Sequence, residues 1–228
     1  MLTSIERVGL ARYDGVADWY ERDFAESELG VATRQIVVEL LGTANGRLLD
    51  VGCGGGSHAA AFAELGWEVT GVDVSEDQLR LARARGVDAL LGRAEELPFG
   101  EASFDAAVSM WTHTDIDDFP AAAHEVARVL RSGAPFVYLG VHPCFVGPHS
   151  RNVGALGIPE LHAGYRETAR CTEAPGITPE GLRARVGVSH LPLATLVQAF
   201  LQAGFVVERF EEPGEREYPY RLAMRWRK

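Results

Sequence analysis

The chain has 228 residues, of which 46% are hydrophobic and 24% are charged, a composition typical of a globular protein with a substantial core. Its formal net charge of −10 argues against a nucleic acid partner, because binding to a phosphate backbone requires a basic surface. No apolar run approaches the ~18 residues of a membrane span, and the first residues do not resemble a signal peptide, so we expect no membrane partner.

The three cysteines, Cys53, Cys144 and Cys171, are odd in number and widely spaced. This arrangement suits neither a disulfide framework nor a zinc site, so we expect a cytoplasmic protein without a bound metal ion. No repeat or low-complexity tract divides the chain, and residues 1–228 are predicted to form a single domain.

Two segments near the start of the chain are predicted to be helical. Residues 12–24 carry aromatic side chains at roughly helical spacing, at positions 13, 19, 20 and 24, which is typical of a short amphipathic helix that packs on the domain. Residues 30–41 are apolar at positions 31, 36, 37, 40 and 41, and they are predicted to form a helix of the scaffold.

A glycine-rich run is the most informative stretch of the sequence. Residues 47–57 read Arg-Leu-Leu-Asp-Val-Gly-Cys-Gly-Gly-Gly-Ser, in which the apolar start predicts a buried strand and Ser57 is predicted to cap the following helix. Glycine allows positive φ angles and lets a ligand approach the main chain, and a helix offers unpaired N–H groups at its start. The run therefore predicts a site for an anionic or polar, nucleotide-like group.

The next predicted strand, residues 67–73, ends in a carboxylate. Asp73 stands about twenty residues after the first glycine, the place at which a carboxylate holds a ribose diol in nucleotide-binding folds. A dinucleotide-binding fingerprint requires a third glycine at the sixth position counted from Gly52, where this chain has Ser57. The mismatch disfavours a nicotinamide-dependent oxidoreductase, which we keep as an alternative.

Beyond Asp73 the apolar periodicity predicts alternating helices and strands. The predicted strands are residues 87–91, 103–110, 136–141, 205–210 and 220–226, and the predicted helices lie around 79–82 and at 120–130 and 192–203. This succession predicts an α/β fold with a doubly wound sheet. Residues 142–189 are rich in Gly, Pro and His and lack a clear period, so we expect this segment either to cap the site or to be disordered.

The spacing Asp50-x-Gly52-x-Gly54-x-Gly56, followed by Asp73, resembles the first motifs of the class I S-adenosylmethionine-dependent methyltransferases. The pattern Tyr13-Asp14-x-x-Ala17-x-x-Tyr20 resembles the N-terminal lid of their small-molecule branch, methyltransferase type 11, which includes quinone-biosynthesis enzymes. The resemblance implies a Rossmann-like sheet of seven strands with the last strand antiparallel. It also implies a helical lid in residues 1–44 and a cap over the acceptor in residues 142–189.

The resemblance further implies S-adenosylmethionine as the cofactor, with its amino acid end at the glycine loop and its ribose on Asp73. Relatives usually carry Asp where this chain has Arg93, and that Asp accepts a hydrogen bond from the adenine amino group. Arg93 has donors only, so we expect it to lie on the adenine ring while the Ala94 N–H serves a ring nitrogen. The resemblance assigns to the cofactor the residues Tyr13, Tyr20, Asp50, Gly52, Cys53, Gly54, Asp73, Val74, Arg93, Ala94, Glu95, Ser109 and Met110.

The implied reaction is methyl transfer from S-adenosylmethionine to an O, N or C atom of a small molecule. His113 and His142 follow the fourth and fifth strands on the ligand side of the sheet, and they are candidates for a general base or, alternatively, structural residues. A binder or cyclase of the same fold is the alternative function. The tetrapeptide Ser109-Met-Trp-Thr112 differs from the Asn/Asp-Pro-Pro-Tyr signature of enzymes that methylate bases or glutamine, which disfavours a macromolecular acceptor.

Overall fold

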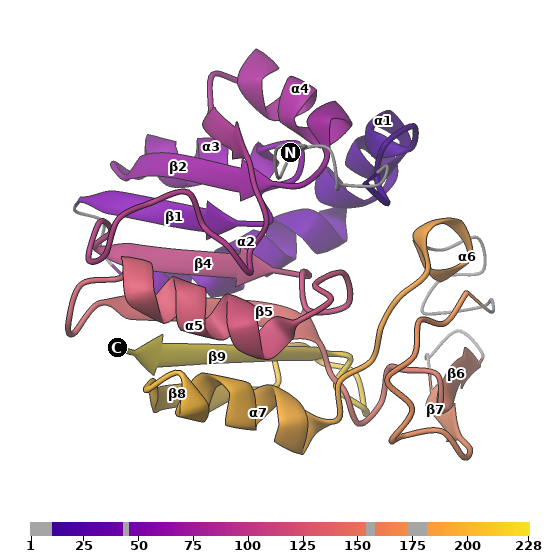
Figure 1. The fold of residues 1–228 in the computed structure, drawn as a ribbon. Coiled ribbons are helices and arrows are strands. Elements are labelled where there is room, and N and C mark those ends of the chain that lie inside the picture. Colours follow the sequence, from indigo (N-terminus) through magenta and orange to yellow (C-terminus); the bar gives the residue numbers. More distant parts are fainter. Residues whose placement is uncertain (1–10, 43–45, 154–157, 173–181) are drawn as a thin grey trace, which may run out of the picture.

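The computed structural model describes residues 11–42, 46–153, 158–172 and 182–228, which fold around a seven-stranded sheet (Figure 1). The strand order is β3-β2-β1-β4-β5-β9-β8. β1 to β5 run parallel, and β9 is antiparallel to both β5 and β8, so the predicted sheet with an antiparallel last strand is confirmed. The strands are β1 (Arg47–Val51), β2 (Glu68–Asp73), β3 (Asp88–Leu91), β4 (Ala106–Met110), β5 (Pro135–Val141), β8 (Val206–Glu211) and β9 (Arg221–Arg227).

Helices cover both faces of this sheet (Figure 1). α5 (Phe119–Val129) and α7 (Leu193–Gln202) pack on one face and belong to the larger core cluster, together with residues of the strands. α2 (Glu28–Leu41) and α3 (Ser57–Glu64) cover the other face, and α4 (Glu76–Ala84) packs beside β3. Burial from both sides explains why β4 is apolar along its length, with all five residues buried.

The chain connections create a binding site beyond the carboxyl ends of the strands. β1 leads into α3 on one face, whereas its neighbour β4 leads into α5 on the opposite face (Figure 1). The chain therefore leaves these two strands in opposite directions, and a crevice opens beyond their carboxyl ends. The glycine loop and the segment after β4 both border this crevice.

The start of α3 differs from the prediction. Its N-cap is Gly56, with a φ of 77°, and Ser57 is the first helical residue, so Ser57 is not the cap. A side chain on Gly56 would approach Cα and Cβ of Ala82 in α4 to 2.9 Å. The position therefore requires glycine for two reasons, the left-handed backbone and the close packing of α3 on α4.

The N-terminal helix predicted over residues 12–24 is interrupted. α1 covers only Ala17–Tyr20, and the chain continues as the π-helix η2 (Glu21–Ala25) before α2 begins.

The fourth strand starts at Ala106 rather than Ser103, because the N–H groups of Ser103 and Phe104 donate to the carbonyl of Val129 instead of to a neighbouring strand.

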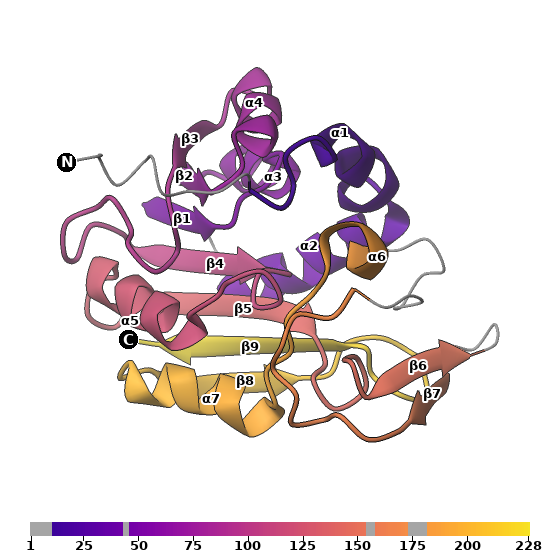
Figure 2. The same cartoon turned by 45° about the vertical axis from the view of Figure 1, so that its right-hand side comes forward.

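Residues 142–189 contain regular structure that the sequence did not predict. β6 (Ser150–Val153) pairs with β7 (Ile158–Leu161) in a separate antiparallel hairpin. This hairpin projects beyond the amino end of β9 (Figures 1 and 2). α6 (Leu182–Val186) lies beside the α1 region (Figure 2). Residues 1–10 and 43–44 of the predicted lid, and 154–157 and 173–181 of the predicted cap, lie outside the described residues.

Phe200 of α7 joins the helix layer to the sheet. Its fully buried ring stacks on Trp226 at 4.7 Å between centroids and meets Phe119 and Tyr138 at 5.4 Å. We expect Phe200→Ala to lower the free energy of unfolding by about 3–5 kcal/mol, because the large cavity it leaves lies among side chains that cannot collapse. Chemical denaturation measures this loss. Leu201→Ala, at the next position and 44% exposed, is the control and should change stability by less than about 1 kcal/mol.

Candidate functional site

A cavity of about 420 Å³ lies at the carboxyl ends of β1, β2 and β4. Its wall combines the glycine loop, the end of β2, the turn after β3, the segment after β4 and the N-terminal residues 11–20. The volume lies within the range of small-molecule sites, and the position at the switch point of the sheet is where ligands bind in open α/β folds.

The glycine loop presents bare backbone to this cavity. Gly52 and Gly54 line it, and both have positive φ angles, of 75° and 52°. A side chain on Gly52 would collide with the methyl group of Thr112, whereas a Cβ on Gly54 would meet nothing closer than Gln78 Oε1 at 3.7 Å. The space beside Gly54 is therefore open toward the cavity, so a ligand can approach its main chain.

Asp73 lines the cavity beside this loop. Its Oδ2 accepts a hydrogen bond from Gly54 N–H and its Oδ1 accepts one from Ser75 N–H, both at 2.9 Å. Burial raises the pKa of Asp73, and these two backbone N–H groups oppose the shift. Each carboxylate oxygen keeps a further lone pair, so the group can still accept hydrogen bonds from two ligand hydroxyls.

Three predicted cofactor residues lie behind the cavity wall rather than in it. Asp50 is buried at the end of β1, where burial, together with the charge of Asp73, raises its pKa to about 7. Cys53 packs with α4 and faces Gly71 of β2. Ser109 donates to the carbonyl of Val51 at 3.2 Å. Their side chains therefore pack behind the cavity and support the strands and the loop whose residues line it.

Two tyrosines of the N-terminal segment, which we define as residues 11–25, form one wall. Tyr13 and Tyr20 line the cavity, and their rings meet edge to face at 5.1 Å. The segment is attached to the glycine loop by Glu21, whose carboxylate pairs with Arg85 at 2.7 Å while Arg85 donates to the carbonyl of Gly55 at 2.8 Å. The predicted aromatic residues thus stand over the predicted loop.

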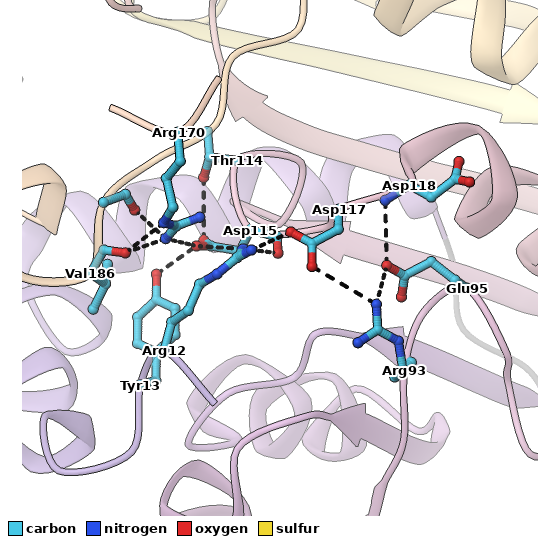
Figure 3. Close-up of polar contacts among 11 residues, drawn as sticks. Arg12, Tyr13, Arg93, Glu95, Thr114, Asp115, Asp117, Asp118, Arg170 and Val186 are labelled. Atoms are coloured by element: carbon cyan, nitrogen blue, oxygen red, sulfur yellow. Dashed lines mark hydrogen bonds and ion pairs between the residues drawn. The ribbon is translucent and has the colours of Figure 1, made fainter. Parts of the chain in front are cut away.

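The turn after β3 forms the opposite wall. Ala94 and Glu95 line the cavity there, and Val74, directly after β2, and Met110, at the end of β4, also line it. Arg93 also lines it, and its Nη2 pairs with Glu95 Oε1 at 2.9 Å (Figure 3).

Neither histidine that we expected to face the acceptor lines the cavity. His113 is 1% exposed, its Nδ1 shares a hydrogen bond with Tyr138 Oη at 2.6 Å, and burial lowers its pKa to about 3. His142 is buried between Cys144 N–H, which donates to its Nδ1, and Glu212, 2.8 Å from its Nε2. Both rings are buried and each is paired with a polar group of the protein, Tyr138 for His113 and Glu212 for His142.

Several cavity residues were absent from our prediction, and three of them carry side chains that bear on the chemistry of the site. Trp111 follows β4 with a φ of 63°, unusual for a bulky residue, and lines the cavity. Gln78 is 2% exposed, and its Oε1 has no hydrogen-bond partner. Asp115 lines the cavity within the acidic stretch that follows β4. The acidic stretch was visible in the sequence, but which of its side chains turns inward depends on the path of the loop.

Comparisons with known proteins show a likeness to methyltransferases. Residues 49–138 match the family model described as "Methyltransferase domain". The chain is 34% identical over 129 residues to the O-methyltransferase resE of Aspergillus sclerotiorum, covering 51% of this chain and 49% of that protein. It is 31% identical over 144 residues to a demethylmenaquinone methyltransferase of Renibacterium salmoninarum, covering 60% of each. The chain thus spans about half of the length of such relatives.

Solved structures show the same fold over nearly the whole chain. An S-adenosylmethionine-dependent methyltransferase from Mesorhizobium loti superposes with a TM-score of 0.71 at 24% identity, covering 94% of this chain and 99% of that one. The [4+2]-cyclase SpnF superposes with a TM-score of 0.60 at 19% identity, covering 90% and 84%. These likenesses and the family match confirm the predicted resemblance to S-adenosylmethionine-dependent methyltransferases.

The environment of His113 predicts a pH effect on stability. Its pKa is about 3 in the folded protein and ~6.5 in an unfolded chain, so the unfolded state binds more protons as the pH falls below about 6.5. The contribution of neutral His113 to stability is therefore complete at pH 7 and falls by about 2 kcal/mol at pH 5. We expect the difference in free energy of unfolding between the parent and His113→Gln to be smaller at pH 5 than at pH 7 by this amount. Chemical denaturation at both pH values measures it. If the difference in free energy of unfolding were the same at both pH values, the prediction that His113 is buried and neutral would be contradicted.

Proposed function

We propose that this chain, whose residues 49–138 form a domain of the methyltransferase family, transfers a methyl group from S-adenosylmethionine to a small molecule. The observation that carries the proposal is the meeting of bare glycine backbone and the Asp73 carboxylate in one cavity of about 420 Å³. This pairing suits a ligand that has both a polar chain and a ribose diol.

The residues present fit that cofactor. The open space beside Gly54 admits the amino acid end against the main chain, and Asp73 accepts hydrogen bonds from the ribose hydroxyls. The buried side chain of Gln78, with an unpartnered Oε1, stands next to both groups and offers a further polar contact. Ala94 and Val74 supply the backbone and apolar contacts that an adenine ring needs.

The cofactor supplies a methyl group that is activated by a sulfonium centre, so this chain contributes chiefly alignment and shielding. Tyr13 and Tyr20 stand over the cavity and reduce access of water, while Trp111 borders the space next to the end of β4. Since His113 and His142 do not line the cavity, we assign no proton transfer to either. Methyl transfer then relies on an acceptor atom that is nucleophilic when it arrives.

The similarity in fold to the [4+2]-cyclase SpnF supports a second candidate function, cyclisation without methyl transfer. Incubation with S-adenosylmethionine labelled in the methyl group, followed by mass spectrometry of small molecules carried through purification, separates the two. Transfer of label identifies a methyltransferase, whereas binding without transfer to any co-purified acceptor favours the cyclase. Binding of NADH in place of S-adenosylmethionine would overturn both candidates.

We propose that the reaction takes place in the cytoplasm and that its partner is a small molecule. All three cysteines are free, which supports a reducing cytoplasm, and the net charge of −10 supports a small-molecule rather than a nucleic acid partner. In the described part of the chain, no helix is both long and apolar enough to cross a membrane. The same residues contain no cluster of three or more side chains suited to a metal ion.

Asp73→Ala should lower the affinity for S-adenosylhomocysteine at least tenfold, because charge-assisted hydrogen bonds to the ribose contribute about 1.5–3 kcal/mol each. Titration calorimetry measures the dissociation constant, and circular dichroism verifies the fold. Asp88→Ala, an exposed aspartate at the start of β3, is the control and should bind like the parent. An unchanged dissociation constant in Asp73→Ala would remove the ribose assignment.

Gly54→Val should abolish measurable binding of S-adenosylhomocysteine. The β-branched side chain would enter the open space beside the loop, and a φ of 52° resists it. Gly133→Val is the control that separates backbone strain from loss of the binding space. Gly133 also has a positive φ, of 79°, but it lies in the turn before β5, and nothing lies within 4 Å of its Cβ position. Binding should survive in Gly133→Val, and normal binding in Gly54→Val would contradict the site.

A further inference from the structure

Three segments that are distant in the sequence meet at the Asp115 carboxylate in the cavity wall (Figure 3). Tyr13 Oη, from the N-terminal segment, donates to Asp115 Oδ2 at 3.1 Å. Arg170, from residues 142–189, places its Nη2 at 3.4 Å from Asp115 Oδ1. Arg12 donates to the Asp115 main-chain carbonyl and pairs with Asp117 on the cavity rim. One partly buried carboxylate in the cavity wall thus contacts both the N-terminal segment, which lines the cavity, and Arg170 of the 142–189 segment.

The link through Arg170 extends further along the 142–189 segment. The Arg170 guanidinium also donates to the carbonyl of Gly187 at 2.6 Å and, through Nε, to that of Val186 at 3.0 Å. Next to it, Ser189 N–H donates to the carbonyl of Thr114 at 2.8 Å. The turn that follows α6 is therefore fixed to Asp115 and to Thr114 beside it, through one side chain and one main-chain bond.

The two segments also contact each other directly. The guanidinium of Arg185 in α6 lies 4.2 Å from the centroid of the Trp19 ring in α1, a cation–π contact. Figure 2 shows α6 beside the helical turns of the N-terminal segment. Together with Asp115, this contact closes a ring of interactions that runs from the N-terminal segment to α6 and back to the cavity wall.

The energetics make Asp115 the critical member of this ring. Burial raises the pKa of its carboxyl, and Arg170, Tyr13 and Arg12 oppose the shift, so the negative charge depends on partners from the two other segments. Arg170 in turn has one buried nitrogen, Nη1, with no partner. If either segment moves away, the charges that remain lose partners in a site with little solvent to replace them. Opening of one segment therefore weakens the attachment of the other.

We propose that Asp115 is a positioning residue that couples the N-terminal segment, which lines the cavity, to the described residues 158–172 and 182–189. Release of the demethylated cofactor then requires the N-terminal segment to part from Asp115. The statement about release rests on the proposed function, whereas the coupling of the two segments is a property of the protein alone. The two parts are therefore tested by separate measurements.

The test uses the full chain and three variants, Asp115→Asn, Tyr13→Phe and Arg170→Gln. Hydrogen exchange of the ligand-free protein should show faster exchange in both segments for every variant. The informative result is the crossed effect: Tyr13→Phe should raise exchange around Arg170, and Arg170→Gln should raise it around Tyr13, although these two side chains meet only through Asp115. Stopped-flow measurement should show that S-adenosylhomocysteine leaves Asp115→Asn about tenfold faster than the parent.

A purely structural role would give a different pattern. Asp18→Asn is the control, because this aspartate lies on α1, is 74% exposed in its side chain and, within the described residues, pairs only with Arg80, so it should leave exchange and release unchanged. Faster exchange confined to the mutated segment in Tyr13→Phe and Arg170→Gln would overturn the proposal, even if Asp115→Asn fails to fold. Absence of S-adenosylhomocysteine binding to the parent would refute the proposed function, while the exchange result would still decide the coupling.

Discussion

The hydrogen bond from Gly54 N–H to the Asp73 carboxylate joins the two halves of the site, and the cavity depends on it. It holds the loop after β1 against the end of β2 with its backbone toward the ligand space. It also favours the charged form of Asp73 in its partly buried position, because the N–H groups of Gly54 and Ser75 oppose the rise in pKa that burial causes. The other cavity residues are arranged around this junction, on elements that the sheet already places.

Much of this arrangement could be predicted because it is encoded locally. A short apolar run followed by glycines predicts a strand that ends in a loop, and Asp73 stands at the end of the next such run. The alternation of strand and helix then determines a doubly wound sheet, in which the carboxyl ends of β1 and β4 open between helices on opposite faces. These features require no knowledge of distant contacts.

The direction of individual side chains could not be predicted in the same way. Beyond Met110 the chain leaves the strand through Trp111, whose positive φ turns the next residues so that His113 faces the core and Asp115 faces the cavity. Propensity does not indicate such a turn, because bulky residues rarely adopt it. The partners of His142 and Asp115, Glu212 and Arg170, lie about 55–70 residues away in the sequence, so their pairing arises only in the folded chain.

The backbone of Trp111 has a consequence for how this protein could be changed. A left-handed conformation costs a bulky residue about 1–2 kcal/mol, and glycine at the same position would avoid that cost. Glycine would also remove an indole that both lines the cavity and packs beside the core cluster under α2. Selection for thermal stability and selection for the shape of this cavity therefore favour different residues at position 111, so a stabilising change to glycine should be expected to alter the cavity.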